Sequence, residues 1–395
     1  MKEIVITGAV RTPIGKFGGN LAGVPAADLG AAVIKEVMVR SKLPGELVDE
    51  VIMGCVLQSG LGQNIARQSA MKAGIPDKVP AMTVNNVCGS SLKAVNLAYS
   101  MIASGEAEII IAGGTENMSA SPYLLPNARF GYHMNDGKII DSMIKDALWD
   151  AFYDYHMGIT AENLADRYNI TRKMQDVFAS ESQQKCERAR KAGIFKDEIV
   201  GIPVKTKTGL KIITDDEAPR DNVTEESLLN LKPVFREEGT VTAGNSSGIN
   251  DGAAAVVITS KEKAMELGLP IMAVIKGCQS AGVDPSIMGI GSAVSTSKLL
   301  NKLSYTIEDI DLIEANEAFA AQALAVKQIL NWKEEKVNVN GGAIALGHPV
   351  GASGCRILVT LLYELKRRNG KLGLATLCVG GGMGVSTIIQ NITVE

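Results

Sequence analysis

The chain has 395 residues, of which 46% are hydrophobic, 21% charged and 4% aromatic, and its formal net charge is −3. This length exceeds what one hydrophobic core usually serves, so we expect two or more packed units. The near-neutral charge argues against nucleic acid or an anionic membrane as the main partner. No apolar run reaches the roughly 18 residues that span a bilayer. Because the chain starts directly with the β-like residues 4–6 and shows no signal-like segment, we expect a cytoplasmic protein.

Short apolar runs alternate with longer helical patterns, which predicts an α/β protein. Strands are expected at 4–8, 51–56, 108–113, 254–259, 311–315 and 373–379. Helices are expected at 27–40, 62–73, 90–103, 161–168, 174–191, 317–330 and 352–367. Residues 119–249 carry more charge, isolated Pro and Gly, two helical pieces and few strands. This composition predicts an insertion folded over an α/β body.

An internal repeat relates the two ends of the chain. Val48-Asp49 aligns with Ile310-Asp311 at an offset of 262, and 89–91 align with 351–353 at the same offset. Glycines 113–114 and 380–381 form a third pair at an offset of 267. Coincidence among short Gly/Ser matches is the alternative. Three elements in one order favour two pseudo-symmetric halves.

Six cysteines stand at positions 55, 88, 186, 278, 355 and 378, without the close pairing of metal sites or the density of a disulfide scaffold. We expect no metal site, and most of these cysteines should be small buried side chains. Cys88 differs, because Gly89, Ser90 and Ser91 follow it at the opening of an expected helix. The N–H groups and dipole of a helix start would lower the pKa of its thiol. A buried cysteine at a loop–helix junction is the plainer alternative.

Three further segments carry side chains suited to catalysis. His348 is one of only three histidines and lies in the glycine-rich stretch 341–354, where an imidazole could act as a base on a closely approaching ligand. Cys378 precedes the run Gly380-Gly381-Gly382, whose N–H groups could hold an oxyanion. Asn316 follows an expected strand and could orient a water or a carbonyl. A loop-capping histidine, a plain turn and a simple N-cap are the structural alternatives.

Together these segments resemble the thiolase family. NNVCGSSLKAV, NEAFA, GGAIALGHPVGASG and CVGGGMG stand in family order, and RTPIGKFGG and AGNSSGINDGAAA are also similar. The resemblance covers essentially the whole chain. It implies a layered αβαβα body of two duplicated halves. We expect residues 1–118, completed by about 250–270, as the first half, 119–249 as an inserted loop domain over the active site, and 271–395 as the second half.

The resemblance also implies the roles of the matched residues. Cys88 would be the nucleophile that takes the acyl group, His348 its base, and Cys378 the group that exchanges the α-proton of the second thioester. Asn316 would hold a water that forms one oxyanion hole with His348, and the N–H groups of Cys88 and Gly380 would form the other. Contacts to the acyl end and to coenzyme A would come from His156, Met157, Arg220, Ser247, Met288 and Phe319. Helix packing, surface charge and core packing are the alternatives for these six.

The activity implied is the reversible Claisen condensation of two acetyl-CoA to acetoacetyl-CoA and CoA, without a metal or redox cofactor. A degradative 3-ketoacyl-CoA thiolase for longer chains, a condensing enzyme that uses acyl-carrier protein and a non-catalytic acyl-CoA-binding protein are the alternatives. Relatives are dimers or tetramers, and we expect a homotetramer, with 119–140 as a candidate assembly loop and a dimer as the alternative. Since Cys88 and Cys378 should reach the same substrate atoms, they could also form a regulatory disulfide.

Overall fold

The computed structural model describes residues 2–207 and 209–392. Its main sheet has the strand order β14-β15-β16-β13-β1-β12-β5-β3-β4, with β2 paired to β12. Its strands are β1 (Ile4–Arg11), β2 (Gly15–Lys16), β3 (Glu50–Gly54), β4 (Ala81–Val84), β5 (Ile109–Asn117), β12 (Asn250–Ser260), β13 (Ala273–Gly282), β14 (Leu312–Ala315), β15 (Leu372–Val379) and β16 (Met383–Asn391).

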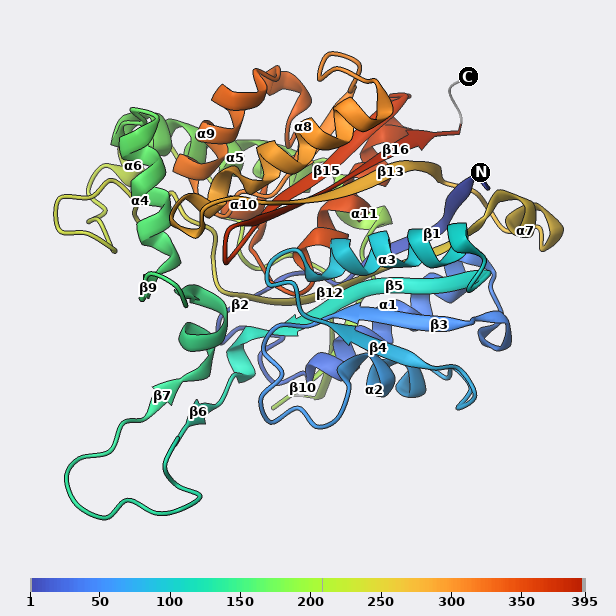
Figure 1. Cartoon of the computed structure of the whole chain (residues 1–395), viewed down its shortest axis with the longest axis horizontal. Helices are drawn as coiled ribbons and strands as arrows, with labels where there is room; N and C mark the ends of the chain where they lie inside the picture. Colours follow the sequence, from blue (N-terminus) through green and yellow to red (C-terminus); the bar gives the residue numbers. More distant parts are fainter. Residues whose placement is uncertain (1, 208, 393–395) are drawn as a thin grey trace.

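The sheet consists of two half-sheets built to one plan. They meet at β1 and β13, which pair only at Val5↔Val274 and Ile6↔Ala273. In the first half, β1-β12-β5 is antiparallel and β5-β3 is parallel. In the second half, β13-β16-β15 is antiparallel and β15-β14 is parallel. Figure 1 shows the C-terminal half, in orange and red, above the N-terminal half, in blue and cyan.

Two equivalent aspartates confirm the predicted duplication. Oδ2 of Asp49, before β3, accepts hydrogen bonds from two successive N–H groups at the start of β5. Oδ2 of Asp311, before β14, accepts from two successive N–H groups at the start of β15. The β1–β12 and β13–β16 pairings are also each interrupted by one irregularity near their start.

One part of the predicted repeat is wrong. Because the N–H of Asp49 bonds to Ile109 and that of Asp311 to Leu372, Gly113 in the middle of β5 corresponds to Thr376 and not to Gly380. The glycines of β5 serve close packing instead. A Cβ on Gly114 would lie 2.2 Å from the carbonyl oxygen of Gly351, so only glycine fits there.

Helices occupy three layers around the half-sheets. Helices α3 (Ser90–Ser104) and α11 (Ser353–Arg367) pack against each other in the middle, within the largest hydrophobic cluster, which includes residues of both half-sheets. Helices α1 (Ala26–Ser41) and α2 (Ile65–Lys72) cover the outer face of the first half-sheet. Helices α8 (Gly291–Leu303) and α9 (Ala320–Leu330) cover that of the second. The expected αβαβα layering is therefore confirmed.

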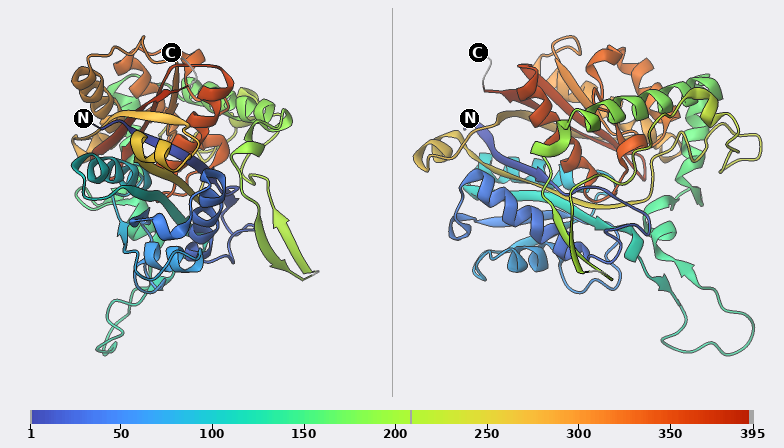
Figure 2. Two further views of the ribbon diagram at one scale, coloured as in Figure 1. Left: turned by 90° about the vertical axis from the view of Figure 1, so that its right-hand side faces the viewer. Right: turned by 180° about the vertical axis from the view of Figure 1, so that it is seen from behind.

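Residues 119–249 contribute helices beside the second half and two protruding hairpins. The segment contains β6 (Tyr123–Leu124), β7 (Ile140–Asp141), the π-helix η3 (Ile144–Leu148), β8 (Trp149–Asp150), β9 (Tyr155–His156), α4 (Met157–Arg167), α5 (Arg172–Lys191), β10 (Ile202–Thr206), β11 (Gly209–Ile213) and α6 (Glu225–Leu228). The arm between β6 and β7 extends far from the body in Figure 1, and Figure 2 shows the β10–β11 hairpin projecting elsewhere. No helix of the described residues is long and apolar enough to cross a membrane.

Several elements differ from the sequence predictions. The helix expected at 317–330 begins only at Ala320, so residues 316–319 form an extended approach to it. Strands β13 and β16 and helix α8 were not expected. The structure also contains α7 (Lys261–Glu266) and α10 (Ala343–Leu346). Strand β13 mixes Lys, Gln and Ser with apolar residues and therefore lacks a clear period.

Candidate active site

Cys88 lies in a tight turn that connects β4, the last strand of the first half-sheet, to α3. The preceding residue, Val87, has a left-handed backbone with φ of 44°, which is unusual for a β-branched side chain and indicates a constrained turn. Hydrogen bonds hold this conformation: the N–H of Val87 donates to Oδ1 of Asn85 (3.0 Å), and Oγ of Ser90 donates to the carbonyl of Val87 (2.6 Å). The turn presents the sulfur beside the helix N-terminus.

Burial dominates the electrostatics of Cys88. It raises the pKa of the Cys88 thiol to about 11, opposed by hydrogen bonds to the sulfur from the N–H groups of Gly380 and of Cys88 itself. The prediction that the helix start lowers the pKa of the Cys88 thiol is therefore wrong for the resting site. Desolvation of the thiolate outweighs the hydrogen bonds from the N–H donors. The same two N–H groups do, however, converge on the sulfur, where an acyl oxygen would develop charge.

His348 lies on the loop before α11, at the expected position near Cys88. Asn250 fixes the loop, since its Oδ1 accepts from the N–H of His348 (2.9 Å) and its Nδ2 donates to the carbonyl of Gly15 (2.9 Å). Nδ1 of His348 lies 2.5 Å from Oγ of Ser353, which itself donates to the carbonyl of Pro349 (2.9 Å). The hydroxyl thus accepts from Nδ1–H, and Nε2 keeps its lone pair. Burial lowers the pKa of His348 to about 3, so the imidazole is neutral.

Asn316 faces His348 from the end of β14. Its Nδ2 lies 3.4 Å from Nε2 of His348, while its buried Oδ1 has no hydrogen-bond partner among the described residues. A buried acceptor without a protein partner is suited to binding a water molecule. The alternative that Asn316 is a simple helix N-cap is excluded, because α9 starts four residues later with Phe319 as its N-cap.

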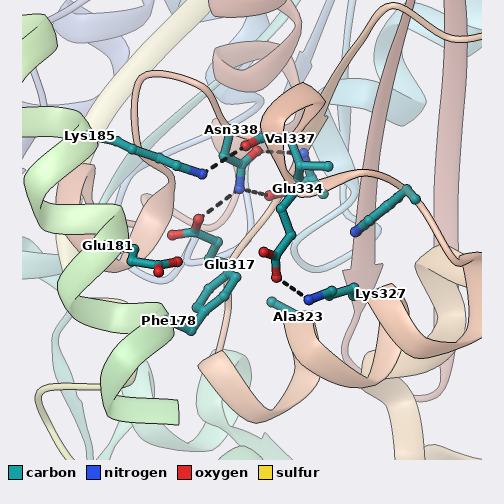
Figure 3. A pocket seen from close by; sticks show the side chains of 11 residues that line it. Phe178, Glu181, Lys185, Glu317, Ala323, Lys327, Glu334, Val337 and Asn338 are labelled. Carbon is teal, nitrogen blue, oxygen red and sulfur yellow. Dashed lines mark hydrogen bonds and ion pairs between the residues drawn. The ribbon is translucent and has the colours of Figure 1, made fainter. Parts of the chain in front are cut away.

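The neighbouring Glu317 anchors this strand end from behind. Figure 3 shows its carboxylate in a small pocket between α5 and α9, next to Asn338. Glu317 accepts hydrogen bonds from Nδ2 of Asn338 (2.8 Å), Oγ of Ser182 (2.7 Å) and the N–H of Ile344 (3.2 Å). Since these partners come from α5 and the loop that leads to His348, Glu317 joins the supports of Asn316 and His348.

Cys378 and Gly380 lie at the turn between β15 and β16. Cys378 is fully buried, and burial raises the pKa of its thiol, with the charge of Cys88 as the next cause. The two sulfurs therefore lie within mutual electrostatic reach. Gly381 and Gly382 have φ of 79° and 80°, so the tight turn after Gly380 depends on glycine.

A single pocket of about 440 Å³ gathers most of the predicted site residues. It is lined by Cys88, His348 and Gly380, so both halves contribute to it. All six predicted substrate contacts also line it: His156, Met157, Arg220, Ser247, Met288 and Phe319. Cys378 and Asn316 do not line the pocket and lie buried against it. Arg220 extends into an adjoining polar pocket that Lys16 also lines.

Two residues at or near the site, Phe235 and Glu116, were not predicted from the sequence. Phe235 lines the pocket, stacks on His156 with ring centroids 4.6 Å apart and meets Phe319 edge-on. It stands between Pro and charged residues in a strandless segment, so no periodicity marks it. Glu116 is fully buried and accepts from the N–H groups of Val56, Leu57 and Gly351, although burial raises its pKa to about 7.

The arrangement is suited to acyl transfer through a thioester. A thiol with N–H donors beside it, a neutral imidazole with a free nitrogen and a second thiol nearby meet at one pocket. Such groups can form a covalent acyl intermediate and remove a weakly acidic proton. The described residues include no group of three or more His, Cys, Asp or Glu able to hold a metal ion.

Comparison with known proteins agrees with this chemistry. The family models for the thiolase N-terminal domain and the thiolase C-terminal domain match residues 4–262 and 269–391. The acetyl-CoA acetyltransferase of Pseudomonas aeruginosa is 58% identical over 98% of both chains. That of Cupriavidus necator is 56% identical over 99% of this chain and 100% of its own.

Solved structures give the same result. The acetyl-CoA acetyltransferase of Bacillus anthracis superposes with a TM-score of 0.97 at 46% identity, and human mitochondrial 3-ketoacyl-CoA thiolase with 0.96 at 44%, each over 99% of both chains. Fold and relatives thus define an acyltransferase. The chain belongs to the thiolase family.

Proposed function

We propose that the protein is an acetyl-CoA C-acetyltransferase, which reversibly joins two acetyl-CoA molecules into acetoacetyl-CoA and CoA through an acetyl-Cys88 intermediate. The observation that carries this proposal is the pocket in which Cys88, His348 and Gly380 meet, with Cys378 and Asn316 against it. Names of relatives at 53–58% identity support the substrate.

In the first half-reaction, Sγ of Cys88 attacks the thioester carbonyl of acetyl-CoA. Nε2 of His348 takes the thiol proton and passes it to the departing CoA sulfur, which leaves acetyl-Cys88. Both groups are neutral at rest, so the proton moves as the carbon–sulfur bond forms. The N–H groups of Cys88 and Gly380, which point at the sulfur, stabilise the oxyanion. Such donors contribute about 3–4 kcal/mol each.

In the second half-reaction, Nε2 of His348 takes the thiol proton of Cys378, and the resulting thiolate of Cys378 removes a proton from the methyl group of a second acetyl-CoA and is a thiol again. The resulting enolate oxygen is stabilised by Nε2–H of His348, now protonated, and by a water held on Asn316. The carbanion attacks the carbonyl carbon of acetyl-Cys88, and the carbon–sulfur bond to Cys88 breaks. Acetoacetyl-CoA leaves, and the proton on Nε2 of His348 passes to the sulfur of Cys88, which restores the resting state of both thiols and of the imidazole.

We place coenzyme A along the pocket and the adjoining polar pocket. His156 and Phe235 form an apolar wall for the pantetheine, and Ser247 lies next to it. Lys16 and Arg220 line the outer, polar part, where their charges suit the phosphates of the nucleotide. The thioesters are substrates, so the proposed reaction needs no metal or redox cofactor.

A 3-ketoacyl-CoA thiolase for longer chains is the second candidate, because one such enzyme superposes over 99% of the chain. A short acyl group is favoured by the side chains around Cys378. Met157, Met288 and Phe319 are all buried and cluster with it. They fill the space that a longer chain would need beyond the reacting carbon.

We also propose that the enzyme is a cytoplasmic homotetramer, assembled through the arm between β6 and β7. Phe130 and Met134 at this arm are 85% and 88% exposed, and exposed apolar side chains on a protruding segment favour burial against another subunit. The double variant Phe130→Ser/Met134→Ser should give smaller assemblies in light scattering. An unchanged molar mass would refute this role of the arm.

The function is tested by the CoA-dependent cleavage of acetoacetyl-CoA by the wild type and by Cys88→Ala. Cleavage by the wild type, its loss in the variant, and slower cleavage of longer 3-ketoacyl-CoAs would support the proposal. Equal or faster cleavage of longer chains would favour the second candidate. Absence of any cleavage by folded, reduced enzyme would refute both.

A further inference from the structure

Arg356 is a buried arginine that lies close to the catalytic loop. It is 2% exposed and belongs to α11. Ser353, whose hydroxyl holds Nδ1 of His348, lies three residues earlier in the same helix. Side chains three apart on a helix are neighbours on one face. Arg356 and Ser353 are therefore neighbours on one face of α11.

On its other side, Arg356 approaches the strand that carries Asn316. Nη1 of Arg356 lies 3.6 Å from Oε2 of Glu314, which is two residues before Asn316 on β14. None of the three guanidinium nitrogens has a hydrogen-bond partner among the described residues. Burial also raises the pKa of Glu314 to about 8, against the effect of Arg356. The charge of Arg356 is thus poorly compensated where it lies.

An arginine in this position is a poor choice for stability alone. Burying a guanidinium without hydrogen bonds costs several kcal/mol, and an apolar side chain of similar volume would pack as well or better. The neighbouring Ile357, Leu358 and Leu361 of α11 are apolar and lie in the largest hydrophobic cluster. A positive charge retained at this cost indicates a use in the site.

We propose that Arg356 is a positioning residue for the pair His348 and Asn316, acting through Ser353 on one side and Glu314 on the other. The proposal rests on the proposed function. The positive charge of Arg356 repels a proton on the imidazole, so His348 enters each acyl transfer as a neutral base. The contact of Arg356 with Glu314 fixes the register of β14 beside α11. This register sets how Asn316 faces Nε2 of His348.

The charged groups around His348 support this assignment. Burial is the main cause that lowers the pKa of His348, and the charge of Arg356 is the second. Two uncharged groups face His348: the neutral thiol of Cys88, in the turn before α3, and the amide of Asn316, at the end of β14. Glu116 of β5 binds the N–H of Gly351 on the same loop. Glu198 lies beyond Arg356 and is bound by Arg11.

The test is the pH profile of kcat/KM for acetoacetyl-CoA cleavage, from pH 4 to 9, in Arg356→Met and Arg356→Lys. Without the charge, His348 protonates more readily, so the acid side of the profile should move to higher pH in Arg356→Met. If the pKa of His348 rises by about one unit from about 3, the ratio of kcat/KM at pH 4 to that at pH 8 should fall roughly twofold relative to the wild type. Arg356→Lys keeps the charge and should keep the wild-type profile.

Thr360→Val is the matched control, because Thr360 lies one turn further along the same buried face and donates to Glu198 (3.1 Å). It should lower thermal stability without moving the profile. A purely structural role for Arg356 predicts profiles of the same shape in all variants, and this outcome would overturn the proposal. If Arg356→Met does not fold, Arg356→Gln removes the charge while keeping a polar side chain. Wild-type cleavage that is lost in Cys88→Ala, measured in the same series, separates failure of this proposal from failure of the function.

Discussion

Nδ1 of His348 and Oγ of Ser353 lie 2.5 Å apart, and the hydroxyl donates in turn to the carbonyl of Pro349. This geometry selects the tautomer in which Nε2 is the free nitrogen, directed to Asn316 and the pocket. Ser353→Ala removes the acceptor for Nδ1–H, so the imidazole loses both its orientation and its preferred tautomer. A hydrogen bond of this kind contributes about 1 kcal/mol, and we expect kcat to fall roughly fivefold.

Steady-state kinetics check this prediction, with KM for CoA expected to change little, because Ser353 does not line the pocket. Ser353→Thr retains the hydroxyl and serves as the control. Full kcat in Ser353→Ala would show that packing alone orients the imidazole.

The protonation state of Cys88 gives a second prediction. Burial raises the pKa of this thiol to about 11, so the resting enzyme holds little thiolate at neutral pH. Alkylation by iodoacetamide requires the thiolate, and its rate constant at Cys88 should therefore rise roughly tenfold per pH unit from pH 7 to 10. Mass spectrometry of the Cys88 peptide measures it. A plateau below pH 8 would mean that the N–H donors outweigh burial.

The sequence predicted which side chains meet at the pocket, but not their protonation states. Cys88, His348, Asn316 and Cys378 each stand in a short motif with unusual local composition, so they could be picked out without knowledge of the fold. The expected low pKa of Cys88 failed because it depends on how much of the second half covers the turn. Gly89, for example, packs against Val379, and this contact cannot be inferred from its own segment.

The prediction of strands and of pocket residues from the sequence has the same limit, because it lacks the tertiary packing. Apolar strands such as β1 and β12 are buried along their whole length and were predicted from composition alone. Strand β13 includes partly exposed polar positions and was missed. Phe235 was missed as a pocket residue because its partner, His156, is 79 residues away in the chain. Contacts of this kind are set by tertiary packing.

Cys88 and Cys378 lie within electrostatic reach of each other, which keeps the hypothesis of a regulatory disulfide open to test. Treatment with diamide, which takes up the two hydrogens released by the two thiols, should inactivate the enzyme, and dithiothreitol should restore it. Peptide mapping of the inactive protein should show a Cys88–Cys378 linkage. Inactivation without that linkage, or inactivation that persists in the reducing agent, would argue for damage at another site.

The close crossing of α3 and α11 gives the last prediction. A Cβ on Gly354 would lie 2.6 Å from Cβ of Leu92 and 2.7 Å from its nitrogen, so Gly354→Ala must push the two central helices apart. Alanine would by itself favour the helix by about 1 kcal/mol, whereas overpacking a core costs about 1–3 kcal/mol. We expect net destabilisation in chemical denaturation and reduced kcat, since these helices carry Cys88 and Ser353 at their starts. Gly23→Ala, where a Cβ meets nothing within 4 Å, is the control, and equal stability of the two variants would show that the crossing yields without strain.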